Sequence, residues 1–158
     1  DDLLERHDLN VSEALEVVHE APLMLMDGAH NPEAADALVD TLTELCPGRP
    51  IHLLVGMSGD KSPEEFGRRV GRLAVSATCT RGRHPRALAP VQLAGRLWPF
   101  CPDVHVMSDA ADALTYLLNA VSAQDVIVVT GSLFLVGELR SALRQSHLRS
   151  RRQAQLVG

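Results

Sequence analysis

The sequence predicts an α/β protein: a Rossmann-like three-layer sandwich on a mostly parallel sheet of about six strands, with one antiparallel edge strand. Short β-like runs alternate with helical stretches along the chain, the order typical of a parallel sheet with helices on both faces. The runs LLVGM (53–57) and VIVVT (126–130) are apolar without alternation, as strands buried on both faces are. The run LEVVHE (15–20) alternates in part, which indicates the edge strand.

The expected elements follow one another with short connections. Strands are predicted at 15–20, 21–27, 51–57, 74–80, 102–107 and 125–132, and helices at 32–45, 62–73, 90–98, 108–121 and 133–145. Helix 32–45 has apolar residues three or four positions apart, and Pro47-Gly48 ends it. Ser62 and Glu65 have the spacing of a capping box. We expect residues 1–158 to form a single domain, with 149–158 as a frayed tail.

Composition excludes several classes of function. The net charge of -5 leaves no basic footprint for nucleic acid, and no apolar run approaches the roughly 20 residues of a membrane helix. The start has neither Met nor signal-peptide character, so we expect a piece of a longer, cytoplasmic protein. Three widely spaced cysteines fit reduced thiols better than disulfides or a zinc site.

Unusual residues gather where the predicted strands end. In a parallel sheet, ligands bind beyond the carboxyl ends of the strands. Four such ends carry the segments 27–31, 56–61, 80–83 and 130–132. The sequence therefore predicts one rim that holds the functional residues.

Three side chains at this rim each allow a functional and a purely structural interpretation. Asp27 can accept hydrogen bonds from ribose hydroxyls or cap the following turn. His30 can bind an anionic group and act near neutral pH, or it can hydrogen-bond a neighbouring loop. Ser132 stands where the N–H groups of a helix start can meet an anion, or it is a plain N-cap. Asn31 and Pro32 are expected to cap and open a helix.

Several other stretches do not match the motifs of known catalytic or metal sites. GMSGDKS (56–62) lacks the spacing of a P-loop, so Lys61 either reaches a phosphate or carboxylate or is simply solvated. No G-x-S-x-G elbow occurs, so the sequence does not predict a serine hydrolase. We expect no metal site, because the remaining histidines lack paired helical spacing: His7, His19, His52, His84, His105 and His147. His52 and His105 are expected to be satisfied histidines within strands.

Four ordered stretches carry a family resemblance. They are LMLMDGAHNP (23–32), LLVGMSGDKS (53–62), RHPRALAPVQLA (83–94) and VIVVTGSLFLVGELR (126–140). Together they resemble the C-terminal domain of the folylpolyglutamate synthase and dihydrofolate synthase family, a branch of the Mur ligase superfamily. The resemblance covers about residues 15 to 145.

The resemblance implies a function and a partner. It implies ATP-dependent ligation of L-glutamate to a folate or dihydropteroate through an acyl phosphate. It also implies an N-terminal ATPase domain that carries the P-loop and the magnesium ligands, without which this chain is inactive. By the same resemblance, Asp27 contacts ATP, His30 takes part in glutamate binding or catalytic closure, and Ser132 lies near the incoming glutamate.

One stretch departs from the family pattern. Family members usually carry an arginine just before the strand LEVV, whereas this chain has Glu13 and Ala14 there. Arg6 substitutes from upstream, or the contact with ATP is weaker. Two alternatives stay open: a non-catalytic binding lobe and the C-terminal domain of a murein-peptide ligase. The sequence leaves open which of the two synthase activities applies, the oligomeric state, and the roles of Lys61 and Arg81.

Overall fold

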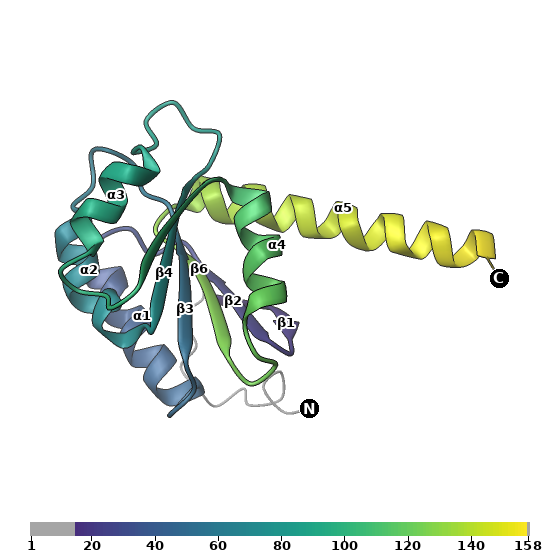
Figure 1. Cartoon of the computed structure of the whole chain (residues 1–158), viewed down its shortest axis with the longest axis horizontal. Helices are drawn as coiled ribbons and strands as arrows, with labels where there is room; N and C mark the ends of the chain where they lie inside the picture. Colours follow the sequence, from purple (N-terminus) through teal and green to yellow (C-terminus); the bar gives the residue numbers. More distant parts are fainter. Residues whose placement is uncertain (1–14, 158) are drawn as a thin grey trace.

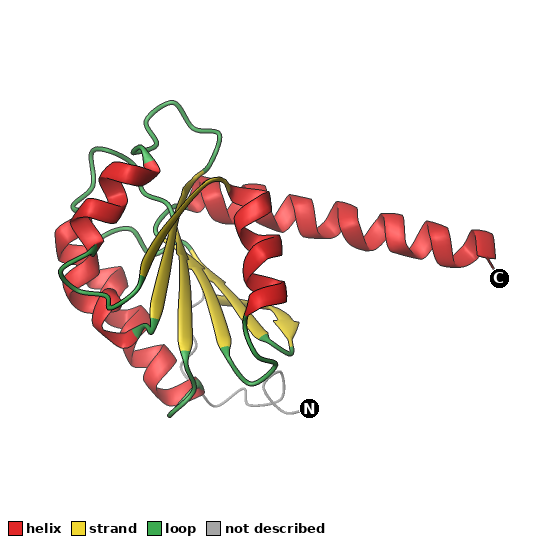
Figure 2. Ribbon diagram, in the orientation of Figure 1, coloured by secondary structure: helices red, strands yellow, loops and turns green. Residues whose placement is uncertain are grey.

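The computed structural model of the chain describes residues 15–157. Its sheet has six strands in the order β1-β2-β6-β3-β4-β5 (Figures 1 and 2). The strands are β1 (Leu15–Glu20), β2 (Leu23–Asp27), β3 (Ile51–Val55), β4 (Ser76–Arg81), β5 (Val104–Asp109) and β6 (Val126–Thr130). Only the β1–β2 pair at the sheet edge is antiparallel; the other four pairs are parallel. The predicted fold class is confirmed.

Helices cover both faces of the sheet, as Figure 1 shows. One face carries α1 (Pro32–Leu45), α2 (Pro63–Val70), a 3-10 turn (Gly71–Leu73) and α3 (Pro90–Leu97), and the other carries α4 (Ala110–Ala120) and α5 (Leu133–Val157). Neighbouring strand residues point to opposite faces. Leu25 and Leu53 therefore pack in the core under α1 to α3, whereas Met26 and Leu54 pack in the core under α4 and α5.

The parallel register places the ends of the central strands side by side. Asp27, the last residue of β2, lies opposite Thr130 of β6, and Thr130 lies opposite Val55 of β3. The loops that leave these strands consequently start at one edge of the sheet. This edge is the rim that the sequence predicts.

Two local expectations were wrong. The tail 149–158, expected to fray, is helical up to Val157, and the last part of α5 extends away from the sheet (Figure 1). The segment 138–157 contains no Gly or Pro to end the helix, and its Arg, Gln and Leu residues favour helix. Ser62 precedes α2 but makes no side-chain cap bond. Glu65 instead pairs with Arg69 one turn later, at 2.6 Å.

The divergent stretch with Glu13 and Ala14, and Arg6 upstream of it, lie outside the described residues.

Candidate functional site

Asp27 closes β2 as a buried carboxylate. The residue is only 3% exposed, and Oδ1 accepts the N–H of Ala29 at 2.8 Å. Burial raises the pKa of Asp27 above its ordinary value, although the Ala29 hydrogen bond acts in the opposite direction. The turn-capping interpretation is therefore correct for Oδ1. Within the part of the chain that the structure describes, Oδ2 makes no hydrogen bond.

His30 is half-buried between β2 and α1. Its Nδ1 lies 2.8 Å from the carbonyl oxygen of Gly28, and a carbonyl can only accept, so Nδ1 carries the proton. Nε2 of the neutral ring is then an acceptor. Asn31 fixes the chain just beyond, because its Oδ1 accepts the N–H of Ala34 at 2.8 Å and caps α1. His30 thus stands on a rigid corner.

Ser132 begins the turn into α5. Its Oγ accepts the N–H of Leu135 at 3.3 Å, so the hydroxyl is an N-cap. Gly131 precedes it with a φ of +99°, and a Cβ at Gly131 would collide with the backbone oxygen of Gly56. Only glycine fits where the loop after β6 passes the loop after β3. This close approach fixes the position of Ser132.

Backbone bonds join the loop after β3 to the loop after β4. The N–H of Gly59 donates to the carbonyl of Arg86 at 2.8 Å, and the N–H of Leu88 donates to the carbonyl of Met57 at 2.8 Å. Ser58 and Ala87 form an isolated antiparallel bridge between them. These bonds bring Lys61 and Arg86 to the same part of the rim.

His30 and Ser132 line one hollow at this rim, of about 270 Å³. Its wall comes from four loops: His30, Ser58, Asp60, Lys61, His84, Arg86, Gly131, Ser132, Leu133 and Phe134. Asp27 is three residues from His30 in the chain but does not line this hollow. The structure therefore brings two of the three predicted site residues together and leaves the third behind them.

The charges of this hollow are arranged unevenly. Lys61 and Arg86 contribute two cations, and Asp60 contributes one anion. A hydrogen bond from the Ser58 hydroxyl lowers the pKa of Asp60, and the charges of Lys61 and Arg86 act in the same direction. Asp60 is therefore a carboxylate at neutral pH, and these three side chains carry a net charge of about +1.

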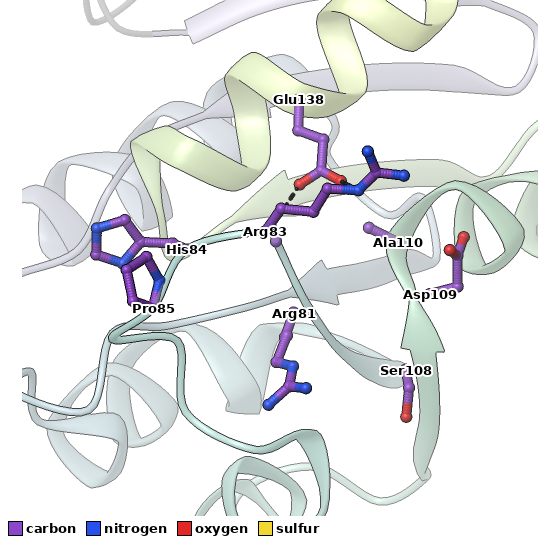
Figure 3. A pocket seen from close by; sticks show the side chains of 9 residues that line it. Arg81, Arg83, His84, Pro85, Ser108, Asp109, Ala110 and Glu138 are labelled. Carbon is purple, nitrogen blue, oxygen red and sulfur yellow. Dashed lines mark hydrogen bonds and ion pairs between the residues drawn. The ribbon is translucent and has the colours of Figure 1, made fainter.

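A larger hollow of about 540 Å³ adjoins the first. In Figure 3, Arg83 lies against Glu138 at one side, and Arg81 lies apart from that pair. The Arg83 N–H donates to Glu138 Oε2 at 2.9 Å, and its Nε is 3.6 Å from Oε1. His84 lines both hollows, so the larger one extends the rim beyond the predicted residues.

Sequence reasoning missed several residues of the smaller hollow. The sequence shows His84 only as one of several scattered histidines, and it indicates no role for Asp60, Arg86 or Phe134. Their spacing in the chain carries no signal for a site, because they approach one another only through the tied loops. The position of all four just beyond β3, β4 and β6 is the one signal that pointed to them.

The described residues 15–157 also bear on metal binding, membrane helices and the state of the cysteines. No group of three or more His, Cys, Asp or Glu residues in this range has the arrangement to hold a metal ion. Among the described helices, none is long and apolar enough to cross a membrane. Cys46, Cys79 and Cys101 are buried free thiols, and burial raises the pKa of Cys79 to about 12.

The sheet has helices on both faces and polar residues at the carboxyl ends of its strands, so the chain is an α/β protein of the kind that binds ligands at this edge. The chain belongs to the family described as Mur ligase, glutamate ligase domain, whose pattern matches residues 15–133.

Within this family, the chain is similar to the C-terminal domain of folylpolyglutamate and dihydrofolate synthases. Folylpolyglutamate synthase of Lacticaseibacillus casei is 31% identical over 129 residues, which are 82% of this chain and 29% of the relative.

Two solved structures share the fold. The folylpolyglutamate synthase of Mycobacterium tuberculosis, complexed with ADP and AMPPCP, matches with a TM-score of 0.74 and 28% identity, over 82% of this chain and 31% of that one. A bifunctional folylpolyglutamate synthase/dihydrofolate synthase with Mn, AMPPNP and L-glutamate bound matches with a TM-score of 0.76 and 29% identity, over 85% and 32%. The chain thus spans about a third of the length of these relatives.

Proposed function

We propose that residues 1–158 form the C-terminal domain of an ATP-dependent ligase that joins L-glutamate to a folate or dihydropteroate. In this proposal the smaller hollow at the rim binds the incoming L-glutamate. The domain acts together with an N-terminal ATPase domain and is inactive without it. The relatives' length, about three times that of this chain, supports the second domain.

Charge complementarity carries the proposal. L-glutamate has two carboxylates and one ammonium group, and the hollow has two cations, Lys61 and Arg86, beside the anion Asp60. Each charge of the ligand therefore meets an opposite charge, and the net charges of ligand and hollow cancel. The volume of about 270 Å³ exceeds that of one amino acid, which leaves room for water or for the reacting end of the second substrate.

His30 and Ser132 have the chemistry that the reaction needs beside this ligand. The amine of glutamate must lose a proton to become a nucleophile, and Nε2 of neutral His30 is an acceptor in the same hollow. Ser132 Oγ already accepts one backbone N–H, so its own O–H is available to donate to a carboxylate. We assign the proton-accepting role to His30 and a substrate-binding role to Ser132.

Asp27 fits a contact with ATP. Its Oδ1 is held by the N–H of Ala29, and Oδ2 is the acceptor that suits a ribose hydroxyl at the end of a parallel strand. ATP supplies the phosphoryl group that activates the carboxylate of the folate. The proposal assigns the magnesium ligands to the N-terminal domain.

The direct test uses the full-length gene product. It is incubated with ATP, magnesium, L-glutamate and either dihydropteroate or a tetrahydrofolate, and ADP release is measured. We expect ADP release that depends on glutamate and on at least one of the two pteridine substrates. A folded protein with no turnover on either substrate favours the non-catalytic lobe. In a parallel assay a murein peptide replaces the pteridine substrate, and turnover in that assay alone favours the peptide ligase.

A further inference from the structure

A separate hollow of about 220 Å³ lies at the opposite end of the sheet, beside α4. His52 stands near the start of β3, Ser76 begins β4, and Asp125 directly precedes β6. The glutamate hollow, by contrast, is built on the carboxyl ends of these strands. Nothing in the proposed ligation uses the residues at this end.

Ser76, His52 and Asp125 form a continuous chain of hydrogen bonds. Ser76 Oγ is 2.8 Å from Nδ1 of His52, and Nε2 of His52 is 3.0 Å from Oδ2 of Asp125. An ionised carboxylate can only accept, so Nε2 carries the proton of the neutral ring and Nδ1 is the acceptor. Ser76 therefore donates its hydroxyl proton to His52, and the carboxylate holds the ring in that tautomer.

We propose that Ser76 is a nucleophilic serine that takes acyl groups from small uncharged esters. Ser76, His52 and Asp125 are the same three groups as in the Ser-His-Asp hydrolases, with the two ring nitrogens exchanged: Ser76 bonds Nδ1 of His52, and Asp125 bonds Nε2. The carboxylate still orients the ring, and the hydroxyl still faces an acceptor nitrogen. The G-x-S-x-G elbow belongs to one fold of such enzymes, and here Ser76 begins a strand instead. The partners are 24 and 73 residues apart in the chain.

Thr78 supplies a second observation at the same wall. It is 1% exposed, it lines the hollow with Ser76, and its Oγ1 has no hydrogen-bond partner among the described residues. Ser76 and Thr78 are two positions apart on β4, so both side chains point to the same face of the sheet. The Thr78 hydroxyl is thus a buried donor without a partner on the same face as Ser76, and we assign it to the oxyanion that forms during acyl transfer.

The walls of the hollow select the substrate. Leu117, Ala120 and Val121 form an apolar side, which suits a short acyl chain. Among residues 15–157, no Arg or Lys lines the hollow. Asp103 lines it and pairs with His105 at 2.9 Å, and Asp125 lies behind His52. The carboxylate of Asp103 at the wall favours an uncharged ligand over an anion, and the volume of about 220 Å³ favours a small one.

The proposed reaction balances with water as the only co-reactant. Ser76 Oγ forms a bond to the carbonyl carbon, its proton passes to His52 Nδ1, and the oxyanion lies beside Thr78. Collapse breaks the ester C–O bond, and the alcohol leaves with the proton from His52. Water, deprotonated by His52, then cleaves the acyl-serine and releases the carboxylic acid. Asp125 is a positioning residue throughout.

The test treats the purified full-length gene product with a fluorophosphonate and, separately, with p-nitrophenyl acetate. We expect one phosphonyl group per chain, mapped to Ser76 by peptide mass spectrometry, and saturable p-nitrophenol release. Ser76→Ala abolishes both signals, whereas the matched control Ser146→Ala, an exposed serine on α5, keeps them. Asp125→Asn lowers the labelling rate by about 100-fold, the scale of general-base assistance.

The wild-type chain alone can overturn the proposal. If the folded wild-type protein carries no label, or carries it on residues other than Ser76, the proposal is wrong, whatever the variants do. Melting curves for Ser76→Ala and Asp125→Asn separate loss of reactivity from loss of fold. The outcome is independent of glutamate ligation, because no residue of the rim enters the assay.

Discussion

The ring of His84 stacks on the ring of Phe134, with centroids 4.0 Å apart and planes inclined by 25°. The N–H of Arg86 donates to His84 Nδ1 at 3.2 Å, so the neutral ring carries its proton on Nε2. The loop after β4 is thereby tied to the first turn of α5. This pair forms one side of the proposed glutamate hollow.

Replacing Phe134 should weaken that side of the hollow. Phe134→Ala removes the support of His84, and aromatic pairs contribute about 0.5–1.5 kcal/mol. We expect the KM of the full-length protein for L-glutamate to rise about two- to tenfold, with Phe134→Tyr close to the wild type. Trp98→Ala, another exposed aromatic residue, is the control. Equal effects of Phe134→Ala and Trp98→Ala contradict the assignment.

The two cations of the hollow should act on glutamate rather than on ATP. A hydrogen bond to a charged group contributes about 1.5–3 kcal/mol, so Lys61→Ala and Arg86→Ala should each raise the KM for L-glutamate about 10- to 100-fold. The KM for ATP should change little. Arg72→Ala, an exposed arginine in the 3-10 turn, serves as the control. A rise confined to ATP would assign both side chains to phosphate instead.

Ionisation of Asp27 should lower the free energy of unfolding at neutral pH. Burial raises its pKa in the folded state, so the folded protein binds this proton more tightly than the unfolded chain does. Ionised Asp27 therefore destabilises the fold increasingly as pH rises from its ordinary value of 3.8 through the raised pKa. Asp27→Asn, which can still accept the Ala29 N–H, should gain stability relative to the wild type over that rise.

Urea unfolding of both proteins at several pH values measures this difference. A stability gain of Asp27→Asn that is constant with pH, or that shrinks as pH rises, contradicts the account. Activity provides an independent reading, since the same variant should raise the KM for ATP if Oδ2 contacts the ribose.

Gly131 and Gly95 should respond in opposite directions to alanine. Gly131→Ala forces a side chain into a φ of +99° and against the Gly56 oxygen, and strain of this kind costs about 1–3 kcal/mol. Gly95 lies in α3 with open space around it, so Gly95→Ala should add about 0.5–1 kcal/mol of stability. Thermal melting checks both. If the two variants shift Tm in the same direction, the backbone argument fails.

The sequence predicts most of the fold because its elements are locally marked. Helix 32–45 has a cap, an opening proline and a regular apolar stripe, and its bounds are those of α1. The end of α5 was misplaced because nothing in the segment 146–157 stops a helix once one has started. Strand order and register depend on packing between distant segments, so only the class of the sheet could be predicted.

The candidate site likewise has some features that the sequence indicates and others that depend on tertiary packing. His30 and Ser132 lie two or three residues beyond strand ends, so the rule that ligands bind at strand ends indicated the rim at which both line one hollow. The depth of Asp27 depends on helices that pack over β2, which local pattern does not show. Arg86 and Lys61 come to the same hollow through backbone bonds between two loops, such as that from Gly59 to Arg86. The contact of His52 with Asp125 spans 73 residues.

Titration of the ¹⁵N-labelled chain with L-glutamate tests the central claim most directly. The account predicts saturable shifts of the backbone amides of Lys61, Arg86 and Ser132, which weaken strongly in Lys61→Ala. D-glutamate and succinate, which lack the matched ammonium position, should bind more weakly. Saturable shifts that avoid these residues, or no difference between L-glutamate and succinate, would contradict a glutamate site in this hollow.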